Sequence, residues 1–212
     1  MEENRVKEIF AQTKAIITGS HVVYTSGKHG SDYVNKDAVY PYTEETDELC
    51  QAIAERFGDA DVEVVVAPAV GGVILSQGVA RHLTKITGRK VFGIYAEKAD
   101  EGDSLVIKRG YDKFVPGKRV LVVDDVLTTG GSVKKIIELV RDVLNGIIVG
   151  VGVLCNQGNV QPEDVGGVPV LEALINVQMA MHDPDQCPLC AEGVPVNIEV
   201  GKGREFLAKK EG

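Results

Sequence analysis

The sequence predicts an α/β fold in which a doubly wound parallel sheet forms the core and a small N-terminal flap, or hood, precedes it. Two observations lead to this prediction. From residue 62 onward, short apolar runs typical of buried strands alternate with stretches whose apolar residues recur at helical spacing. The preceding residues lack this alternation, and a block of ~40 residues is too small to bury a core of its own. We therefore divide the chain into a flap, 1–42, and a core with a C-terminal extension, 43–212.

The flap begins with an expected amphipathic helix. Apolar residues between positions 3 and 17 recur every three or four residues, and Gly19 ends the pattern. Two short strands follow, at 21–24 and 33–35, on either side of a polar turn. We expect this block to pack on the residues that follow it.

The core elements follow in a regular order. A helix begins at Thr43, with acidic residues in its first turn, and continues to Phe57. The next expected elements are strands at 62–67, 91–96, 119–123 and 147–154, and helices at 73–86 and 133–144. Carboxyl ends of parallel strands share one sheet edge, where ligands bind in this class of fold. Four loop segments should therefore meet there, namely 68–72, 97–98, 124–125 and 155–156.

Residues 119–132 carry the clearest functional signal. An apolar strand ends in Asp124 and Asp125, and a loop of small, hydroxylated residues then leads into a helix. Amides of residues 129–132, at the open start of that helix, can donate to a phosphate, and the glycines let the backbone approach it. The two carboxylates suit sugar hydroxyls or a hydrated Mg²⁺ instead. The stretch therefore predicts a sugar-phosphate site, with an ordinary strand-to-helix turn as the alternative.

Two further loops can complete this site. Residues 68–72, Pro-Ala-Val-Gly-Gly, form a second strand-loop-helix turn suited to backbone donation to pyrophosphate. Residues 97–118 interrupt the alternation with a polar, glycine-bearing insertion, which indicates a lid or, alternatively, a solvated β-ribbon. Neither a Walker loop nor a Gly-x-Gly-x-x-Gly dinucleotide motif occurs in the sequence.

Composition excludes several classes of protein. The net charge is -8 and no basic stretch offsets it, so we expect no binding to nucleic acid. No apolar run approaches the ~20 residues of a membrane span, and the first residues lack the features of a signal peptide. We therefore expect a cytoplasmic protein that does not bind a membrane.

The cysteines and histidines give only a weak signal. Four cysteines are too few for a disulfide framework, although Cys187 and Cys190 form Cys-Pro-Leu-Cys, which is half of a zinc site. The sequence offers no second Cys or His pair close by, and the histidines show no metal-ligand spacing. Structural thiols are therefore expected, and metal binding or redox pairing is the alternative that zinc analysis would test.

Residues 124–132, two acidic residues, two more residues and then Thr-Thr-Gly-Gly-Ser, resemble the phosphoribosyl pyrophosphate (PRPP) signature of type I phosphoribosyltransferases. Within that group the chain most resembles orotate phosphoribosyltransferases. The likeness extends to Thr-Ser-Gly-Lys-His-x-Ser-x-Tyr at 25–33, Pro-Ala-x-Gly-Gly at 68–72, Ala-Glu-Lys at 96–98 and Lys-Arg-Gly at 108–110.

The resemblance implies a type I phosphoribosyltransferase fold and a Mg²⁺-dependent reaction. Ribose 5-phosphate would move from PRPP to a nucleobase nitrogen, with release of pyrophosphate, and orotate would become orotidine 5'-monophosphate in pyrimidine biosynthesis. Mg²⁺ would bind mainly through the pyrophosphate and water, with Asp124 and Asp125 as further ligands. A homodimer whose lid reaches the neighbouring site is also implied. A purine phosphoribosyltransferase and a non-catalytic sensor of PRPP or nucleotides are the alternatives, and pyrophosphate release with a panel of bases would separate them.

The resemblance assigns three groups of site residues. The catalytic residues are Lys98, Asp124 and Asp125. The PRPP-binding residues are Ala69, Val70, Gly71, Gly72, Lys98, Asp124, Asp125, Val126, Leu127, Thr128, Thr129, Gly130, Gly131 and Ser132. The base-binding residues are Lys28, Tyr33, Lys36, Thr128 and Asn156.

Three positions depart from the family pattern. In the lid, Lys98 is followed by acidic residues rather than by Lys-x-His-Gly, and Thr25 stands where many members carry a lysine. Asn156 stands where an arginine is expected to bind the orotate carboxylate. A neutral donor forms a hydrogen bond only about half as strong as a charged one, so the sequence predicts a high KM for orotate.

Overall fold

The structure is a computed structural model that describes residues 1–24, 26–100, 102 and 104–211. Thr25 of the predicted flap turn, and two residues of the predicted lid, Glu101 and Asp103, lie outside the described residues. The chain divides into two compact units. One comprises Met1–Lys7 and Tyr40–Val177, and the other comprises Glu8–Val39 and Gln178–Gly212.

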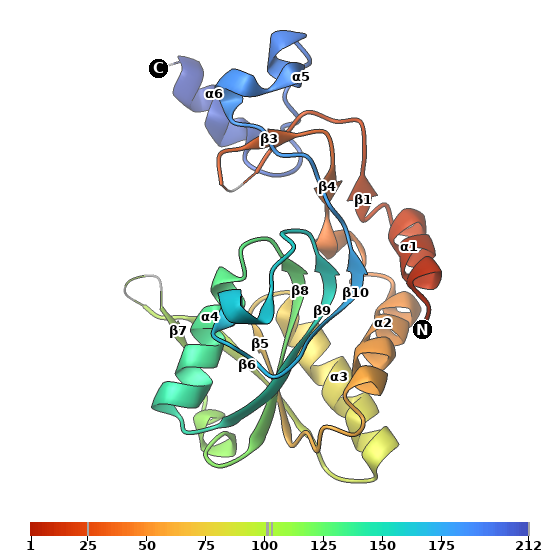
Figure 1. Ribbon diagram of the computed structural model, residues 1–212, viewed down its shortest axis with the longest axis vertical. Helices are drawn as coiled ribbons and strands as arrows, with labels where there is room; N and C mark the ends of the chain where they lie inside the picture. The colour runs from red at the N-terminus through yellow and green to blue at the C-terminus, as the bar shows by residue number, and fades with distance from the viewer. Residues whose placement is uncertain (25, 101, 103, 212) are drawn as a thin grey trace. The chain divides into compact units, whose positions relative to one another are not determined.

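The larger unit is built on a six-stranded sheet in the order β10-β9-β8-β5-β6-β7 among the described residues (Figure 1). The strands are β5 (Val64–Pro68), β6 (Phe92–Lys98), β7 (Leu105–Val106), β8 (Arg119–Leu127), β9 (Ile147–Asn156) and β10 (Leu171–Asn176). All neighbouring strands are parallel except β6 and β7. The strand order reverses between β5 and β8, as in doubly wound sheets, so the predicted fold class is confirmed.

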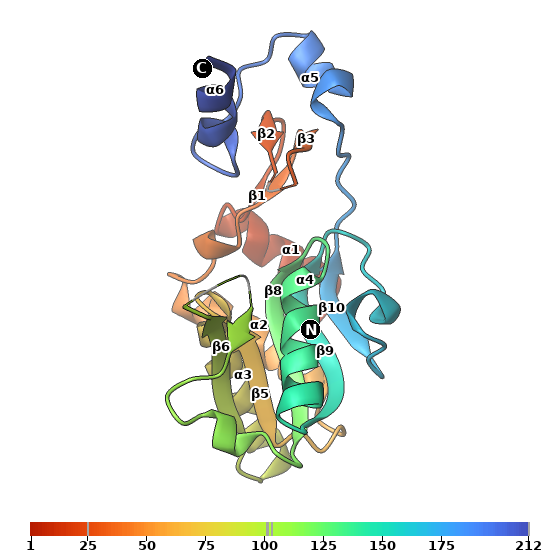
Figure 2. The same ribbon diagram turned by 90° about the vertical axis from the view of Figure 1, so that its left-hand side faces the viewer.

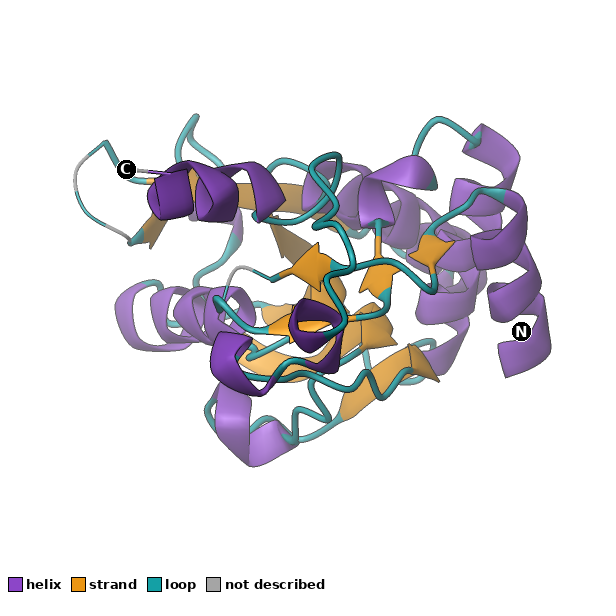
Figure 3. Cartoon of the chain, turned by 90° about the horizontal axis from the view of Figure 1, so that it is seen from above, coloured by secondary structure: helices purple, strands orange, loops and turns teal. Residues whose placement is uncertain are grey.

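Helices cover both faces of this sheet. Helices α2 (Thr43–Arg56) and α3 (Gly72–Thr87) lie on one face, and α4 (Gly131–Glu138) lies on the other, continued by a π-helical turn, η3 (Leu139–Val143) (Figures 1 and 2). Short 3₁₀ turns, η2 (Asp112–Phe114) and η4 (Pro162–Val165), join the remaining elements. The view in Figure 3 shows the strands between the helices.

Helical spacing explains how α4 packs. Val133, Ile136, Ile137 and Val140 recur at the spacing of one helix face, and all four are fully buried in the same core cluster as the valines of β5 and β8. Burying such a side chain contributes about 1.5–3 kcal/mol, which holds the start of α4 at the end of β8.

Strand β8 runs further than the sequence pattern predicts. Strand β8 was expected to end at Val123, but Asp124 still pairs with Val153 of β9, and Leu127 pairs with Asn156. The acidic residues are therefore part of the strand rather than of the loop after it. Backbone pairing with a neighbouring strand continues here in spite of the polar side chains.

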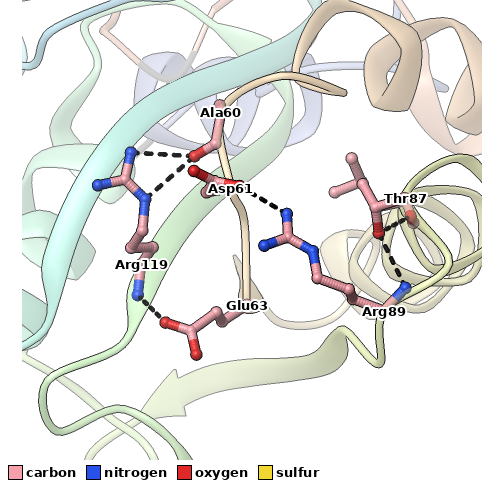
Figure 4. A network of polar contacts seen from close by, with 7 residues as sticks. Ala60, Asp61, Glu63, Thr87, Arg89 and Arg119 are labelled. Atoms are coloured by element: carbon pink, nitrogen blue, oxygen red, sulfur yellow. Dashed lines mark hydrogen bonds and ion pairs between the residues drawn. The ribbon is translucent and has the colours of Figure 1, made fainter.

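Polar contacts hold the opposite end of the sheet, where β5 and β8 begin (Figure 4). The backbone N–H of Arg119 donates to the carboxylate of Glu63 at 3.1 Å, and the Arg119 guanidinium donates to the carbonyl of Ala60 at 3.0 and 3.2 Å. A hydrogen bond from Lys118, together with that backbone N–H, lowers the pKa of Glu63. These contacts align the two central strands at the edge away from the candidate site.

The smaller unit contains two antiparallel strand pairs among the described residues. Its elements are β1 (Ile16–Ile17), β2 (Val22–Val23), β3 (His29–Gly30), β4 (Tyr33–Val34), η1 (Lys36–Ala38), η5 (Pro184–Gln186), α5 (Pro188–Ala191) and α6 (Gly203–Glu211). Strand β1 pairs with β4, and β2 pairs with β3. The predicted turn between residues 24 and 33 therefore contains a strand, β3.

The first helix is shorter than the sequence pattern predicts. The expected helix at 3–17 is observed as α1 (Glu3–Gln12). Lys14 adopts a left-handed conformation with φ of 55°, and Ile16 and Ile17 pair with β4. The helical spacing of those two isoleucines is thus overridden by strand pairing.

Backbone hydrogen bonds explain why the C-terminal segment groups with residues 8–39, although the predicted division places it with the core. The backbone groups of His29 and His182 exchange two hydrogen bonds of 2.8 Å. The N–H groups of Asn197 and Lys202 donate to the carbonyls of His21 and Val23, each at 2.7 Å.

Every helix among the described residues is too short or too polar to cross a bilayer.

Candidate functional site

The candidate site lies at the carboxyl ends of β5 and β8, where the strand order reverses. Asp124 and Asp125 are buried there, with exposed fractions of 7% and 2%. The N–H of Asp125 donates to Oδ1 of Asp124 at 2.9 Å, and the N–H of Val126 donates to Oδ1 of Asp125 at 2.8 Å. The backbone therefore orients both carboxylates.

The loop after β5 abuts the second of these carboxylates. A Cβ atom at Gly71 would lie 2.9 Å from Oδ2 of Asp125, so only glycine fits at this position without a shift. The hydroxyl of Tyr40 donates to the same oxygen at 3.1 Å. The sequence gives no signal for Tyr40, because it belongs to no motif and lies 85 residues from its partner. Residues 68–72 and 124–125 thus meet at one edge, as the topology predicts.

A cavity of about 60 Å³ follows β8. It is lined by Asp124, Val126, Leu127, Thr128, Thr129, Gly130, Gly131, Ser132 and Val133. One water molecule occupies ~30 Å³ in the liquid, so a small anionic group fits this volume. Helix α4 starts here and has no acidic residue in its first turn, so no carboxylate of that turn competes for its N–H groups. The residues of the predicted phosphate loop therefore line a cavity at the start of helix α4.

Two glycines give this loop its shape. Gly130 has φ of 73°, and a Cβ atom there would lie 2.6 Å from Cγ1 of Val165. Gly158 lies so close to Thr128 that a Cβ atom would overlap the Thr128 carbonyl. The N–H groups of Gln157 and Gly158 both donate to the carbonyl of Leu127 at 2.9 Å. The turn after β9 therefore supports the phosphate loop, which a motif confined to residues 124–132 does not reveal.

Gly130→Ala should destabilise the fold by about 1–3 kcal/mol, because the added methyl group overpacks against Val165, and the positive φ adds about 1–2 kcal/mol. Gly131→Ala is the matched control. Its Cβ atom would find its nearest neighbour, Oγ1 of Thr129, at 3.5 Å. Urea unfolding of both variants measures the difference. Equal midpoints for the two would contradict the packing described here.

The amides of the 69–72 loop do not all play the predicted role. The N–H of Ala69 donates to the carbonyl of Ala96 at 2.7 Å, so this amide ties the loop to β6 instead of facing a pyrophosphate. The carbonyls of Val70 and Gly71 accept the N–H groups of Val73 and Ile74 in the first turn of α3, at 3.1 and 3.2 Å. Donation from the N–H groups of residues 70–72 to a pyrophosphate stays a prediction.

Lys98 is the exposed last residue of β6, two positions after the carbonyl that holds Ala69. It is paired in register with Leu105 of β7. Two other basic residues of the lid are engaged with acids: Lys108 Nζ lies 2.9 Å from Asp100, and Arg109 lies 3.3 Å from Glu97. Among the described residues, none forms an ion pair with Lys98, so its ammonium group is available to a ligand.

The side chain of Asn156, predicted to contact the base, is engaged within its own turn. It is 5% exposed, its Nδ2 donates to the carbonyl of Val160, and its Oδ1 accepts the N–H of Val160, each at 2.9 Å. The side chain therefore closes the turn after β9. Thr128 lies in the phosphate loop and is exposed, whereas Lys28, Tyr33 and Lys36 belong to the smaller unit. Contact of these four residues with a base stays a prediction.

Comparisons with known proteins agree on one family. A model of the phosphoribosyl transferase domain matches residues 37–181. The orotate phosphoribosyltransferase of Desulforamulus reducens is 40% identical over 195 residues, which are 92% of this chain and 95% of that protein. The enzyme of the same name from Thermotoga maritima is 38% identical over 203 residues, with 93% and 98% covered.

Solved structures share the fold. Orotate phosphoribosyltransferase from Aeropyrum pernix superposes with a TM-score of 0.62 at 24% identity, covering 80% of this chain and 93% of that one. The Mycobacterium tuberculosis orotate phosphoribosyltransferase in complex with PRPP gives a TM-score of 0.58 at 19% identity, with 82% and 96% covered.

Proposed function

Since the chain belongs to the phosphoribosyltransferase family, and within it to the orotate phosphoribosyltransferases, we propose that this sheet edge transfers ribose 5-phosphate from PRPP to orotate and releases pyrophosphate. One observation carries the proposal beyond the family. Two buried carboxylates, Asp124 and Asp125, lie on the strand that leads into an anion-sized cavity at a helix start, and Asp124 lines that cavity. A site with carboxylates beside an anion-binding cavity suits a sugar phosphate better than a free phosphate.

Each part of the site has a defined task in this reaction. The cavity formed by residues 128–132 holds the 5-phosphate, and this remote binding positions the reacting carbon. Asp124 and Asp125 hold the ribose hydroxyls and balance the positive charge that develops on the ring as the bond to pyrophosphate breaks. The backbone hydrogen bonds at both carboxylates keep them in place before substrate arrives.

The leaving pyrophosphate is bound by the N–H groups of residues 70–72 and by Lys98. These donors belong to the start of α3 and to the end of β6, which the Ala69 hydrogen bond holds together. Carboxylate oxygens are among the ligands that Mg²⁺ prefers, so Asp124 and Asp125 would help to hold this ion together with the pyrophosphate and water. A bound Mg²⁺ would neutralise charge on the leaving group.

The residues that would bind the base are the part of the site that differs from the family pattern. Asn156 replaces the expected arginine and its amide is engaged by Val160. We propose that Thr128, Lys28, Tyr33 and Lys36 contact orotate, with a lysine pairing its carboxylate. Arginine forms a planar, bidentate pair that lysine does not, so a higher KM for orotate than in arginine-bearing relatives is expected.

A panel of bases tests this function. Pyrophosphate release is measured with PRPP and Mg²⁺ and with orotate, uracil, hypoxanthine, xanthine or adenine. We expect turnover with orotate and none above background with the others. Preference for a purine would contradict the assigned base, and tight PRPP binding without turnover on any base would indicate a sensor instead of an enzyme.

We also propose that the enzyme is a cytoplasmic homodimer in which the lid, 97–118, reaches the partner's site. This rests on the family resemblance. Sedimentation measures whether the protein is a dimer. A second test mixes two variants that are each inactive alone, one changed in the lid and one at Asp124. Activity of the mixture would support a lid that reaches the partner's site.

A further inference from the structure

Four potential metal ligands gather in the smaller unit, whereas the residues assigned to PRPP belong to the larger one. They are His21, His29, Cys187 and Cys190, and their ligand atoms all lie within 4.8 Å of one another. His21 and Cys187 are 166 residues apart in the sequence. No part of the proposed transfer reaction uses these side chains.

The distances within this cluster match those around a tetrahedral zinc ion. Zn–S bonds of about 2.3 Å and Zn–N bonds of about 2.0–2.1 Å place nitrogen and sulfur about 3.5 Å apart and two nitrogens about 3.3 Å apart. Nε2 of His21 lies 3.7 Å from Sγ of Cys187 and 3.6 Å from Sγ of Cys190. Nδ1 of His29 lies 3.3 Å from Sγ of Cys190 and 3.0 Å from Nε2 of His21. All four separations agree with the ideal ones to about 0.3 Å.

The hydrogen bond at the far side of one imidazole identifies its metal-binding atom. Nδ1 of His21 lies 2.7 Å from the carbonyl oxygen of Val194. A carbonyl only accepts, so Nδ1 carries the proton and Nε2 presents its lone pair to the cluster. Metal-binding histidines characteristically donate their other N–H to a carbonyl or carboxylate, which fixes the tautomer and orients the ring.

The surroundings hold the other ligands in place. His21, His29 and Cys187 are at most 3% exposed, and Cys190 is the most exposed of the four. The His29 ring meets Phe206 of α6 edge to face, with centroids 4.7 Å apart. Neither thiol is part of a disulfide, and Cys187 and Cys190 are the first and last residues of the Cys-x-x-Cys turn at α5. Two thiols and two imidazoles are a ligand set typical of a closed structural site.

We propose that Nε2 of His21, Nδ1 of His29 and the Sγ atoms of Cys187 and Cys190 bind one Zn²⁺ as a structural site. Binding displaces the protons of the two thiols, so two thiolates balance the charge of the ion and the site is neutral. The ion joins the β2–β3 hairpin to the C-terminal segment, two parts of the chain that otherwise meet mainly through backbone hydrogen bonds. The four ligands leave no position for a substrate.

Metal analysis of the full chain, purified under reducing conditions without chelator, tests the proposal. We expect one zinc per chain. Exchange of Co²⁺ for Zn²⁺ should produce the thiolate-to-cobalt charge-transfer band and the strong visible absorption of a tetrahedral site. A chelator should lower the Tm of the metal-loaded protein, because ligands that bind only the folded state stabilise it.

Two pairs of variants make the test specific. Cys190→Ser and His29→Gln should lose stoichiometric zinc, and the chelator should no longer change the Tm of Cys190→Ser. Cys50→Ala and His182→Gln are the controls and should retain zinc. Cys50 lies in α2, where burial raises the pKa of its thiol to about 12 and keeps it protonated. His182 bonds to His29 only through its backbone in the contacts described above.

Several results would overturn the proposal. One is a reduced wild-type chain that neither contains zinc nor takes up Zn²⁺ or Co²⁺ in a one-to-one ratio. Another is a count of two thiols instead of four in the chain denatured with chelator, since this would mean a disulfide between Cys187 and Cys190. Loss of zinc from the controls to the same extent as from Cys190→Ser would also contradict it. If Cys190→Ser does not fold, the cobalt spectrum of the wild-type chain decides.

Discussion

Replacing Asp124 and Asp125 together by asparagine is expected to abolish turnover and to leave the fold intact. We propose that these two buried carboxylates at the end of β8 balance a positive ribose ring, and loss of one such preorganised group typically lowers kcat by about 10²–10³-fold. Asparagine retains an oxygen that accepts the N–H groups of Asp125 and Val126, so the local backbone is preserved. The measurements are kcat with PRPP and orotate, circular dichroism and Tm.

A double variant at the other edge of the same sheet controls for the loss of charge. Asp59→Asn with Asp61→Asn also removes two negative charges, but near the starts of β5 and β8, where Asp61 pairs with Arg89 at 2.7 Å. This control should retain near wild-type kcat. If the Asp124 and Asp125 double variant also retains activity, the assignment of these residues to the ribose is wrong.

Lys98→Ala is expected to lower kcat by about 10²–10³-fold with a much smaller effect on the KM for orotate. Lys98 ends β6, and the carbonyl of Ala96 in this strand holds the 69–72 loop, so the ammonium group should stabilise charge that grows on pyrophosphate in the transition state. An interaction made only in the transition state lowers kcat and kcat/KM together when it is removed. Steady-state kinetics with both substrates measures this split.

Lys90→Ala is the matched control for this prediction. Lys90 is also an exposed lysine, it lies two residues before the other end of β6, and its ammonium lies 5.4 Å from the centroid of the Phe92 ring. Its removal should leave kcat unchanged. A normal kcat for Lys98→Ala would move the role to Lys108 or Arg109, which would first have to leave Asp100 and Glu97.

The core fold and the phosphate loop follow from residues that are neighbours in sequence. Alternation of apolar strands and helices predicts the parallel sheet, and the order of residues 124–132 predicts carboxylates followed by donors. A strand, a turn and the start of a helix take their geometry mainly from their own residues, so a short sequence describes them well. The end of β8 was placed too early because its pairing with β9 continues past the apolar residues.

Contacts between residues far apart in sequence were decided only by the tertiary structure. Tyr40 reaches Asp125 across 85 residues, Gly158 supports the loop at Thr128, and the side chain of Asn156 turns toward Val160. The sequence shows half a zinc site at Cys187 and Cys190, but the matching histidines occur near the other end of the chain. Backbone pairing of His29 with His182, and of His21 with Val196, brings the histidines and the cysteines together. Spacing along the chain predicts geometry only over the few residues of one turn or strand, whereas these contacts depend on how distant backbone segments pair.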